Sequence, residues 1–243
     1  MTRQRRLATA YSYYGGKGRL WALYPPPKYP LIIEPFAGCA AYAYNYADAH
    51  SVHVNDLDPI THDIWQFLTS PTALTYYGLV PTHVTRGDKV SQMFSEPVPV
   101  GLVKWCQAEV NFGTQGARGI HDQVTPLGAI YWNKNTKRRL LQAIETCQSW
   151  TVTNLDYHDL PDVEATWFVD PPYLNPAGAR YRCGPEGIDY AELSNWCRSR
   201  KGQVIVCENL GATWLPFTPL TPRRGITSRY QKSQAMEVVW VQG

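Results

Sequence analysis

The residues with the clearest chemical potential are Asp170, Pro171, Pro172 and Tyr173, which follow the apolar run at residues 166–169. The amino group of a nucleobase is a poor nucleophile because its lone pair is delocalised into the ring. A carboxylate and a backbone carbonyl that accept hydrogen bonds from this amine would aim its lone pair at a methyl donor. The prolines stiffen such a loop and add no competing N–H donors, and a tyrosine ring offers a stacking face for a base.

An ordinary turn at the end of a strand is the alternative interpretation of this tetrapeptide. Its place after an apolar strand favours the chemical one, because α/β sheets bind ligands beyond the carboxyl ends of their strands.

A turn of small residues is the second signal. Glu34, Phe36 and Gly38 lie between a strand-like run at residues 31–34 and an alanine-rich segment. A glycine there lets a ligand carboxylate approach the N-terminal end of the next helix, whose dipole favours negative charge. Tight packing of a helix on a sheet is the alternative, because it also requires small residues.

Two further positions suit a nucleoside-like ligand. Asp56 ends the strand-like run at residues 51–55, where an acidic side chain can accept hydrogen bonds from both ribose hydroxyls. Capping of the next helix by Asp56 or Asp58 is the alternative. Tyr13 and Lys17 flank two glycines without the spacing of a phosphate-binding loop, so ATP binding is not indicated. This lysine could pair with a ligand carboxylate, or the segment could be an exposed turn.

These positions must be held by alternating strands and helices. The apolar patterns predict strands at residues 31–34, 51–55, 150–154, 166–169, 204–207 and 235–241, and helices at 39–49, from Pro59 onwards and at 190–199. We expect the last strand to pair with a strand before Ser228. The sequence therefore predicts an α/β fold with a doubly wound mixed sheet of the Rossmann-like type.

The middle of the chain departs from this alternation. We expect residues 1–69 and 149–243 to form one domain and residues 70–148 to be an inserted subdomain, with a helix at 137–146 and irregular structure at 76–133. The insertion carries eight Lys/Arg and five Asp/Glu. Its net charge is therefore +3, which equals the net charge of the whole chain. This distribution favours an anionic partner for the insertion.

Composition and length narrow the class of protein. A chain of 243 residues with 44% hydrophobic residues accommodates one substantial α/β domain with a modest insertion. The apolar runs are too short for a membrane span and no signal peptide is apparent, so we expect a cytoplasmic protein without a membrane partner. Six dispersed cysteines lack metal-ligand spacing, so we expect reduced thiols and no metal.

In this order, the four motifs resemble the D12-class, Dam-type N6-adenine DNA methyltransferases, a group with bacterial and phage members. The family pattern runs from an aromatic-x-G-G-K opening through E/D-P-F-x-G-x-G and an acidic residue after the next strand to an insertion and D-P-P-Y. The resemblance covers residues 11–209. Tyr13 stands where tryptophan is common and Ala40 where glycine is usual, which could alter cofactor affinity.

The resemblance implies S-adenosylmethionine as the cofactor, no metal, and methyl transfer to an adenine flipped out of double-stranded DNA. It implies a mobile loop at residues 174–187 over the base, and we expect a monomer or a weak dimer. The implied cofactor contacts are Tyr13, Lys17, Glu34, Phe36, Gly38, Asp56, Asp156 and Asp170. The implied catalytic residues are Asp170, Pro171, Pro172 and Tyr173. Expected DNA contacts are Lys134, Lys137, Arg138, Arg180, Arg182, Arg223 and Arg224.

Several alternatives stay open. N4-cytosine and RNA amino groups would use the same hydrogen-bonding logic, although serine is commoner than aspartate at the first position of the loop in N4 enzymes. Enzymes that methylate glutamine in proteins usually have asparagine at that first position of the loop. The alternative outside the enzymes is that the protein is a catalytically inactive relative that binds DNA. The combination of Lys17, Asp56, Asp170 and Tyr173 favours an active enzyme.

Overall fold

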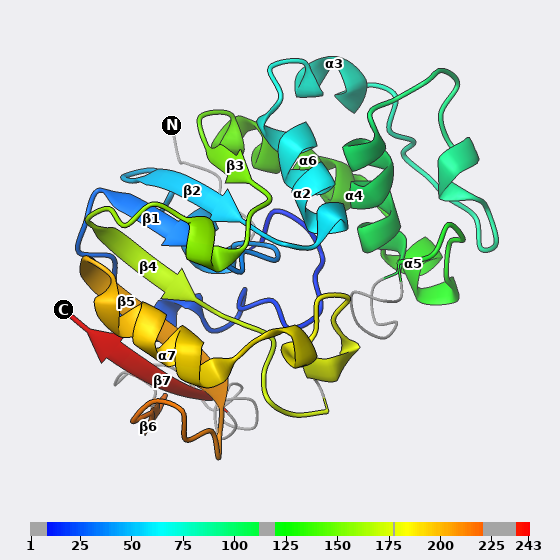
Figure 1. The fold of residues 1–243 in the computed structure, drawn as a ribbon. Helices are drawn as coiled ribbons and strands as arrows, with labels where there is room; N and C mark the ends of the chain where they lie inside the picture. The colour runs from blue at the N-terminus through cyan, green and yellow to red at the C-terminus, as the bar shows by residue number, and fades with distance from the viewer. Residues whose placement is uncertain (1–8, 112–119, 177, 221–236) are drawn as a thin grey trace.

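The sheet is mixed and has the strand order β3-β2-β1-β4-β5-β7-β6 in a computed structural model that describes residues 9–111, 120–176, 178–220 and 237–243 (Figure 1). Strands β1 to β5 are parallel to one another, whereas β7 is antiparallel to β5 and to β6. The strands are β1 (Leu31–Glu34), β2 (Ser51–Asn55), β3 (Thr151–Thr153), β4 (Ala165–Val169), β5 (Gly202–Asn209), β6 (Thr218–Pro219) and β7 (Glu237–Gln242). The predicted α/β class and mixed sheet are confirmed, as is the pairing of the last strand with a strand before Ser228, and the arrangement is compatible with a Rossmann-like fold.

Helices follow most of the parallel strands. They are α1 (Ala41–Tyr46), α2 (Pro59–Thr69), α3 (Ala73–Tyr77), α4 (Val100–Val110), α5 (Pro126–Tyr131), α6 (Lys134–Cys147) and α7 (Tyr190–Ser199). Short 3-10 turns are η1 (Trp21–Leu23), η2 (Val90–Gln92), η4 (Tyr157–Asp159), η5 (Gly178–Arg180) and η6 (Pro185–Gly187). Within the described ranges, no helix is both long enough and apolar enough to cross a membrane.

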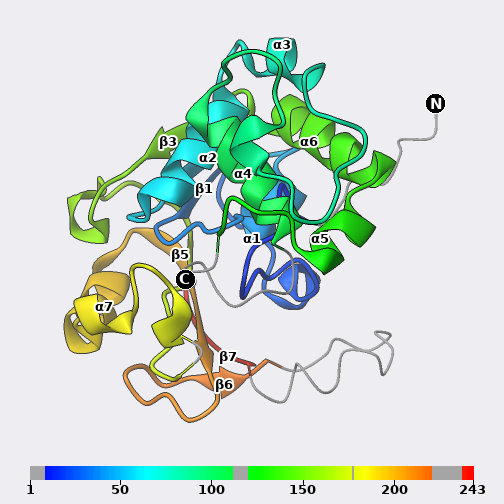
Figure 2. The same cartoon turned by 90° about the vertical axis from the view of Figure 1, so that its right-hand side faces the viewer.

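The central strands are buried on both faces, because successive side chains of a strand point to opposite sides of a sheet. Ile32 and Phe168 pack in a cluster with α1, α2, α4 and α6, whereas Ile33 and Trp167 pack in a second cluster with α7. Figure 2 shows α7 on one side of the sheet and α1, α4 and α6 on the other. This double burial explains why these strands read as short continuous apolar runs.

Two sequence predictions about helices were wrong in part. Helix α1 begins at Ala41 rather than at residue 39, because Ala40 adopts a left-handed conformation with φ 43° and ψ 46° that breaks the helical geometry. The segment predicted to be irregular at residues 76–133 contains α4, which buries Leu102 and Trp105 against the same core as α2. Helix α4 is buried along most of its length, and its buried residues include the polar Gln107 and Glu109, so it lacks the one-sided apolar pattern by which a surface helix is recognised.

The cysteines behave as packed thiols. All six are free, and each is buried except the partly exposed Cys183. Burial raises the pKa of the Cys39 thiol to about 12, so it stays protonated at neutral pH.

The strand order brings the two motif loops together. Strands β1 and β4 are neighbours at the centre of the sheet, while the chain leaves β1 toward β2 on one side and β4 toward β5 on the other. Such a reversal of direction leaves a crevice beyond the carboxyl ends of the two central strands, because the following helices cross opposite faces. The loops that follow β1 and β4 therefore meet at one edge.

Candidate functional site

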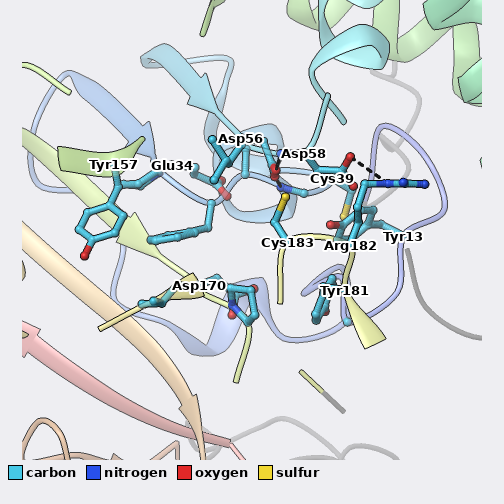
Figure 3. Close-up of a pocket in the computed structure, with 18 of the residues that line it drawn as sticks. Tyr13, Glu34, Cys39, Asp56, Asp58, Tyr157, Asp170, Tyr181, Arg182 and Cys183 are labelled. Carbon is cyan, nitrogen blue, oxygen red and sulfur yellow. Dashed lines mark hydrogen bonds and ion pairs between the residues drawn. The ribbon is translucent and has the colours of Figure 1, made fainter. Parts of the chain in front are cut away.

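A cavity of about 310 Å³ opens at the carboxyl ends of the parallel strands (Figure 3). Gly38, after β1, and Asp170, after β4, both line it, so two of the sequence motifs meet at one cavity. The lining includes all the residues predicted to contact a cofactor, which are Tyr13, Lys17, Glu34, Phe36, Gly38, Asp56, Asp156 and Asp170. Figure 3 shows Asp56 and Asp58 on one side of the cavity and Asp170 and Tyr181 on the other.

The glycine turn after β1 is fixed by hydrogen bonds and by shape. The Gly38 carbonyl accepts hydrogen bonds from the Tyr11 hydroxyl at 2.7 Å and from the Trp65 indole at 2.8 Å, while its N–H donates to Asp56 Oδ2 at 2.8 Å. Gly38 has φ +46°, and a Cβ atom added there would lie 2.7 Å from the Tyr13 ring. The glycine is therefore required both by its backbone conformation and by the neighbouring ring.

We expect Gly38→Ala to lower the free energy of unfolding by about 1–2 kcal/mol and to weaken ligand binding in the cavity at least about tenfold, because the new methyl group strains the backbone and displaces Tyr13. Gly87→Ala is the matched control, since Gly87 has φ +89° but nothing within 4 Å of the added atom. Urea denaturation and calorimetric titration would measure both effects. Equal loss of ligand affinity in the two variants would contradict this reading of the turn.

The acidic residues after β2 divide between two tasks. Asp58 caps α2, because its side chain accepts a hydrogen bond from the Ile60 N–H. Both residues line the cavity, but Asp56 does not cap the helix and accepts hydrogen bonds from the N–H groups of Gly38 and Asp58 at 2.8 and 2.9 Å. Burial raises the pKa of Asp56 to about 7, although these two hydrogen bonds oppose the shift. The alternative that Asp56 is only a helix cap is therefore wrong.

The cavity has an apolar end next to Asp156. Its wall there consists of Phe36, Leu57, Leu155, Tyr157 and Ile188. The side chains of Leu57 and Leu155 are unusually exposed for leucine, with 51% and 39% of their surface accessible. Exposed leucines that face a concave wall are suited to hold a flat apolar group such as an aromatic ring. Asp156 is itself fixed by a 2.7 Å contact between its Oδ1 and His158 Nδ1.

A buried ammonium group lies at the opposite end. Lys17 Nζ is 2.9 Å from Asp170 Oδ1, 3.7 Å from Glu237 Oε1 and 4.8 Å from the centre of the Tyr173 ring. Burial lowers the pKa of Lys17, but the two carboxylates more than compensate and the net shift is upward, so the ammonium stays charged. Burial raises the pKa of Asp170, and the Lys17 charge opposes that shift.

A divalent cation would compete with Lys17 for the same carboxylates. Asp170, Cys207 and Glu237 each place a potential ligand atom within 4.8 Å of the others. The Lys17 ammonium already supplies positive charge to both carboxylates. The donor set therefore favours a lysine-neutralised acidic pair over a metal centre.

The motif loop after β4 is divided between the cavity and the core. Asp170 and Pro172 line the cavity, whereas Pro171 and Tyr173 are not among its lining residues. The Tyr173 hydroxyl donates a 2.5 Å hydrogen bond to Glu237 Oε1, and the Pro172 carbonyl accepts a hydrogen bond from the Tyr190 hydroxyl. In this conformation, the Tyr173 ring therefore packs beside Lys17 instead of facing the open part of the cavity.

The segment after this loop lies along the cavity and contacts two other parts of its wall. The Tyr181 hydroxyl donates to the Tyr14 carbonyl at 2.9 Å, and its ring stacks on Tyr13 with centroids 6.0 Å apart. Arg182 Nε lies 3.6 Å from Asp58 Oδ1. The segment that follows β4 is thus held against both the N-terminal glycine loop and the loop after β2.

The basic residues predicted to contact DNA are dispersed. Lys134 is exposed at the start of α6, Lys137 lies over the Tyr77 ring, and Arg138 is half-buried. Arg180 and Arg182 are exposed on the segment at the cavity, and Arg182 lines it. Arg223 and Arg224 lie outside the described residues. Of the predicted DNA contacts that the structure describes, Arg180 and Arg182 lie on the segment at the site.

Some residues at the cavity were not predicted from the sequence. Leu57 and Leu155 each stand next to a predicted acidic residue at the end of a strand, and this position was the available signal. Cys183 also lines the cavity, but nothing in its sequence context distinguishes it. Glu237 lies 220 positions from Lys17, and a glutamate at the start of an apolar strand was its only signal.

Comparison with known proteins adds no assignment to this geometry. The sequence matches no protein-family model and no curated protein.

Proposed function

We propose that this protein is an S-adenosylmethionine-dependent DNA methyltransferase that modifies the N6 amino group of adenine. One observation carries the proposal: the residues of four motifs, spread from Tyr13 to Asp170, line a single cavity at the carboxyl ends of the central strands. Chance placement of four unrelated turns would not gather their chemical groups around one volume.

The cavity suits the three parts of an adenosyl amino acid. The glycine turn at Gly38 gives a carboxylate close access to backbone, and Lys17 supplies a buried positive charge nearby. Asp56 can accept hydrogen bonds from a ribose diol, since a carboxylate has more acceptor sites than its two backbone bonds use. The apolar end with Leu57 and Leu155 suits an adenine ring, and Asp156 can accept a hydrogen bond from its amino group.

The donor would supply an electrophilic methyl group on a sulfonium centre. In this proposal, Asp170, which lines the cavity, accepts a hydrogen bond from the target amine and directs the nitrogen lone pair. The Lys17 charge lowers the pKa of Asp170 and so opposes the effect of its burial, which favours the ionised form that acts as an acceptor. No covalent link between enzyme and base is needed, which is consistent with the high pKa of Cys39.

The DNA partner is proposed from charge near the site. Arg180 and Arg182 are exposed beside the cavity and can contact phosphates around an extruded base. Helix α6 adds Lys134, Lys137 and Arg138. Phosphate contacts of this kind make the affinity fall steeply as salt concentration rises.

The decisive experiment is incubation of the protein with tritiated S-adenosylmethionine and unmethylated DNA, followed by identification of the labelled nucleoside. N6-methyladenine is the expected product. Parallel incubations with RNA and with protein distinguish the other substrate classes, and N4-methylcytosine would assign the cytosine alternative. DNA binding without any transfer would contradict the proposal and indicate an inactive relative.

The raised pKa of Asp56 predicts how cofactor affinity depends on pH. A carboxylate accepts hydroxyl hydrogen bonds better than a carboxylic acid, and Asp56 ionises only as pH rises through about 7. We therefore expect the dissociation constant of S-adenosylhomocysteine to fall between about pH 6 and about pH 8, by as much as about tenfold. Calorimetric titration would measure it. Asp56→Asn should remove this dependence, and its persistence in that variant would contradict the assignment.

A further inference from the structure

A buried carboxylate from the far end of the chain joins the two halves of the site. Glu237 opens β7 with only 8% of its surface exposed, and Oε1 accepts hydrogen bonds from Tyr173 at 2.5 Å and from Tyr24 at 2.8 Å. The same oxygen lies 3.7 Å from Lys17 Nζ. Glu237 thus contacts residues of the N-terminal glycine loop and of the loop after β4, but it does not line the cavity.

This arrangement is more than a requirement of the fold. An apolar residue could begin a strand at this position, and burial of a carboxylate is costly unless it is paired and hydrogen-bonded. Two tyrosine hydroxyls and one ammonium provide that pairing. Because Lys17 lies between Glu237 and Asp170, the two carboxylates share one positive charge, and the buried group carries one excess negative charge.

We propose that Glu237 is a positioning residue for the reaction, which shares the charge of the Lys17 ammonium with Asp170 and fixes the hydroxyl of Tyr173. Because its charge is shared, Lys17 neutralises Asp170 only in part, so the carboxylate can still accept a hydrogen bond from an incoming amine. The kinetic part of this inference rests on the proposed function, whereas the coupling between the two carboxyls does not.

The charges around Asp170 determine the direction in which its pKa should shift when Glu237 is replaced. The Glu237 charge raises the pKa of Asp170, and Lys17 lowers it. Within the described residues, the other titratable groups that interact with the Asp170 charge are Glu34, Cys39, Cys207, Glu208, Tyr24, Tyr173 and Tyr181. Removal of the Glu237 charge alone should therefore shift the Asp170 titration to lower pH.

Glu237→Gln is the test variant, because its amide oxygen can still accept from Tyr173 and Tyr24 while the charge is lost. We expect kcat to fall about tenfold or more, with KM for S-adenosylmethionine changed less than about threefold, since the Lys17 charge is then no longer shared and neutralises Asp170 alone. The acid limb of the kcat profile should move to lower pH. Thr166→Val is the control for loss of a buried polar contact, because Thr166 bonds Gln203 and the Lys28 N–H away from the cavity.

An NMR titration of the ¹³C-labelled side-chain carboxyl carbon of Asp170 measures the coupling without any turnover. The Asp170 signal is assigned by its absence in Asp170→Asn. A lower titration midpoint in Glu237→Gln supports the inference, and an unchanged midpoint with kinetics like those of Thr166→Val overturns it. If Glu237→Gln does not fold, Tyr24→Phe replaces it, with a smaller shift in the same direction expected. A wild-type protein without methyl transfer would defeat the proposed function, while the carboxyl titration would still decide the coupling.

Discussion

Asp170→Asn is expected to lower kcat by about 10²–10³-fold, while binding of S-adenosylhomocysteine and of DNA changes little. The amide keeps the shape of the side chain, but it loses the negative charge and one of the two acceptor oxygens that direct the target amine. Folding should survive because Lys17 keeps Glu237 as a partner at 3.7 Å. Single-turnover methyl transfer, with donor and DNA affinities measured separately, would check the result.

Asp162→Asn is the control for this variant. Asp162 is paired with Arg200 at 3.6 Å and Lys201 at 3.3 Å and does not line the cavity, so activity should be retained. Equal activity of Asp170→Asn and wild type would show that the Asp170 carboxylate takes no part in methyl transfer. A parallel loss of DNA affinity would instead assign Asp170 to binding.

The strands and their end loops were predictable because several physical signals coincide there. The run at residues 31–34 is apolar, is preceded by prolines and leads into a glycine turn, so its bounds match β1. Helix α7 was found from its one-sided apolar pattern, and Asp189 caps it at the predicted start. The common cavity then followed from the rule that ligands bind beyond the carboxyl ends of central strands.

What the sequence could not predict depends on contacts between distant residues. Helix α4 lacks a one-sided pattern because it is buried between other elements, so only the tertiary structure identifies it. The orientation of Tyr173 depends on Glu237, 64 positions further along the chain. Single residues such as these carry no periodic signal, and their role appears only when the sheet brings β4 and β7 to either side of β5.

Lys17→Met should lower the free energy of unfolding by about 3–5 kcal/mol near pH 8, because it leaves two buried carboxylates without a cation. Burial already raises the pKa of Asp170, and loss of the ammonium raises it further. A folded-state pKa above the unfolded one gives a stability contribution that is present at low pH and is lost as pH rises through the folded-state value. The deficit against wild type should therefore shrink toward about pH 5.

Urea denaturation of the wild type and of Lys17→Met at both pH values measures this difference, with Lys201→Met as the control for loss of an exposed lysine from an ion pair with Asp162. That control should cost less than about 1 kcal/mol at either pH. A deficit of equal size at both pH values would mean that packing of the lysine stem, and not its charge, stabilises the site. A deficit confined to high pH would establish that the ammonium is what permits two acids to share the interior of this protein, a condition on which an ionised Asp170 depends.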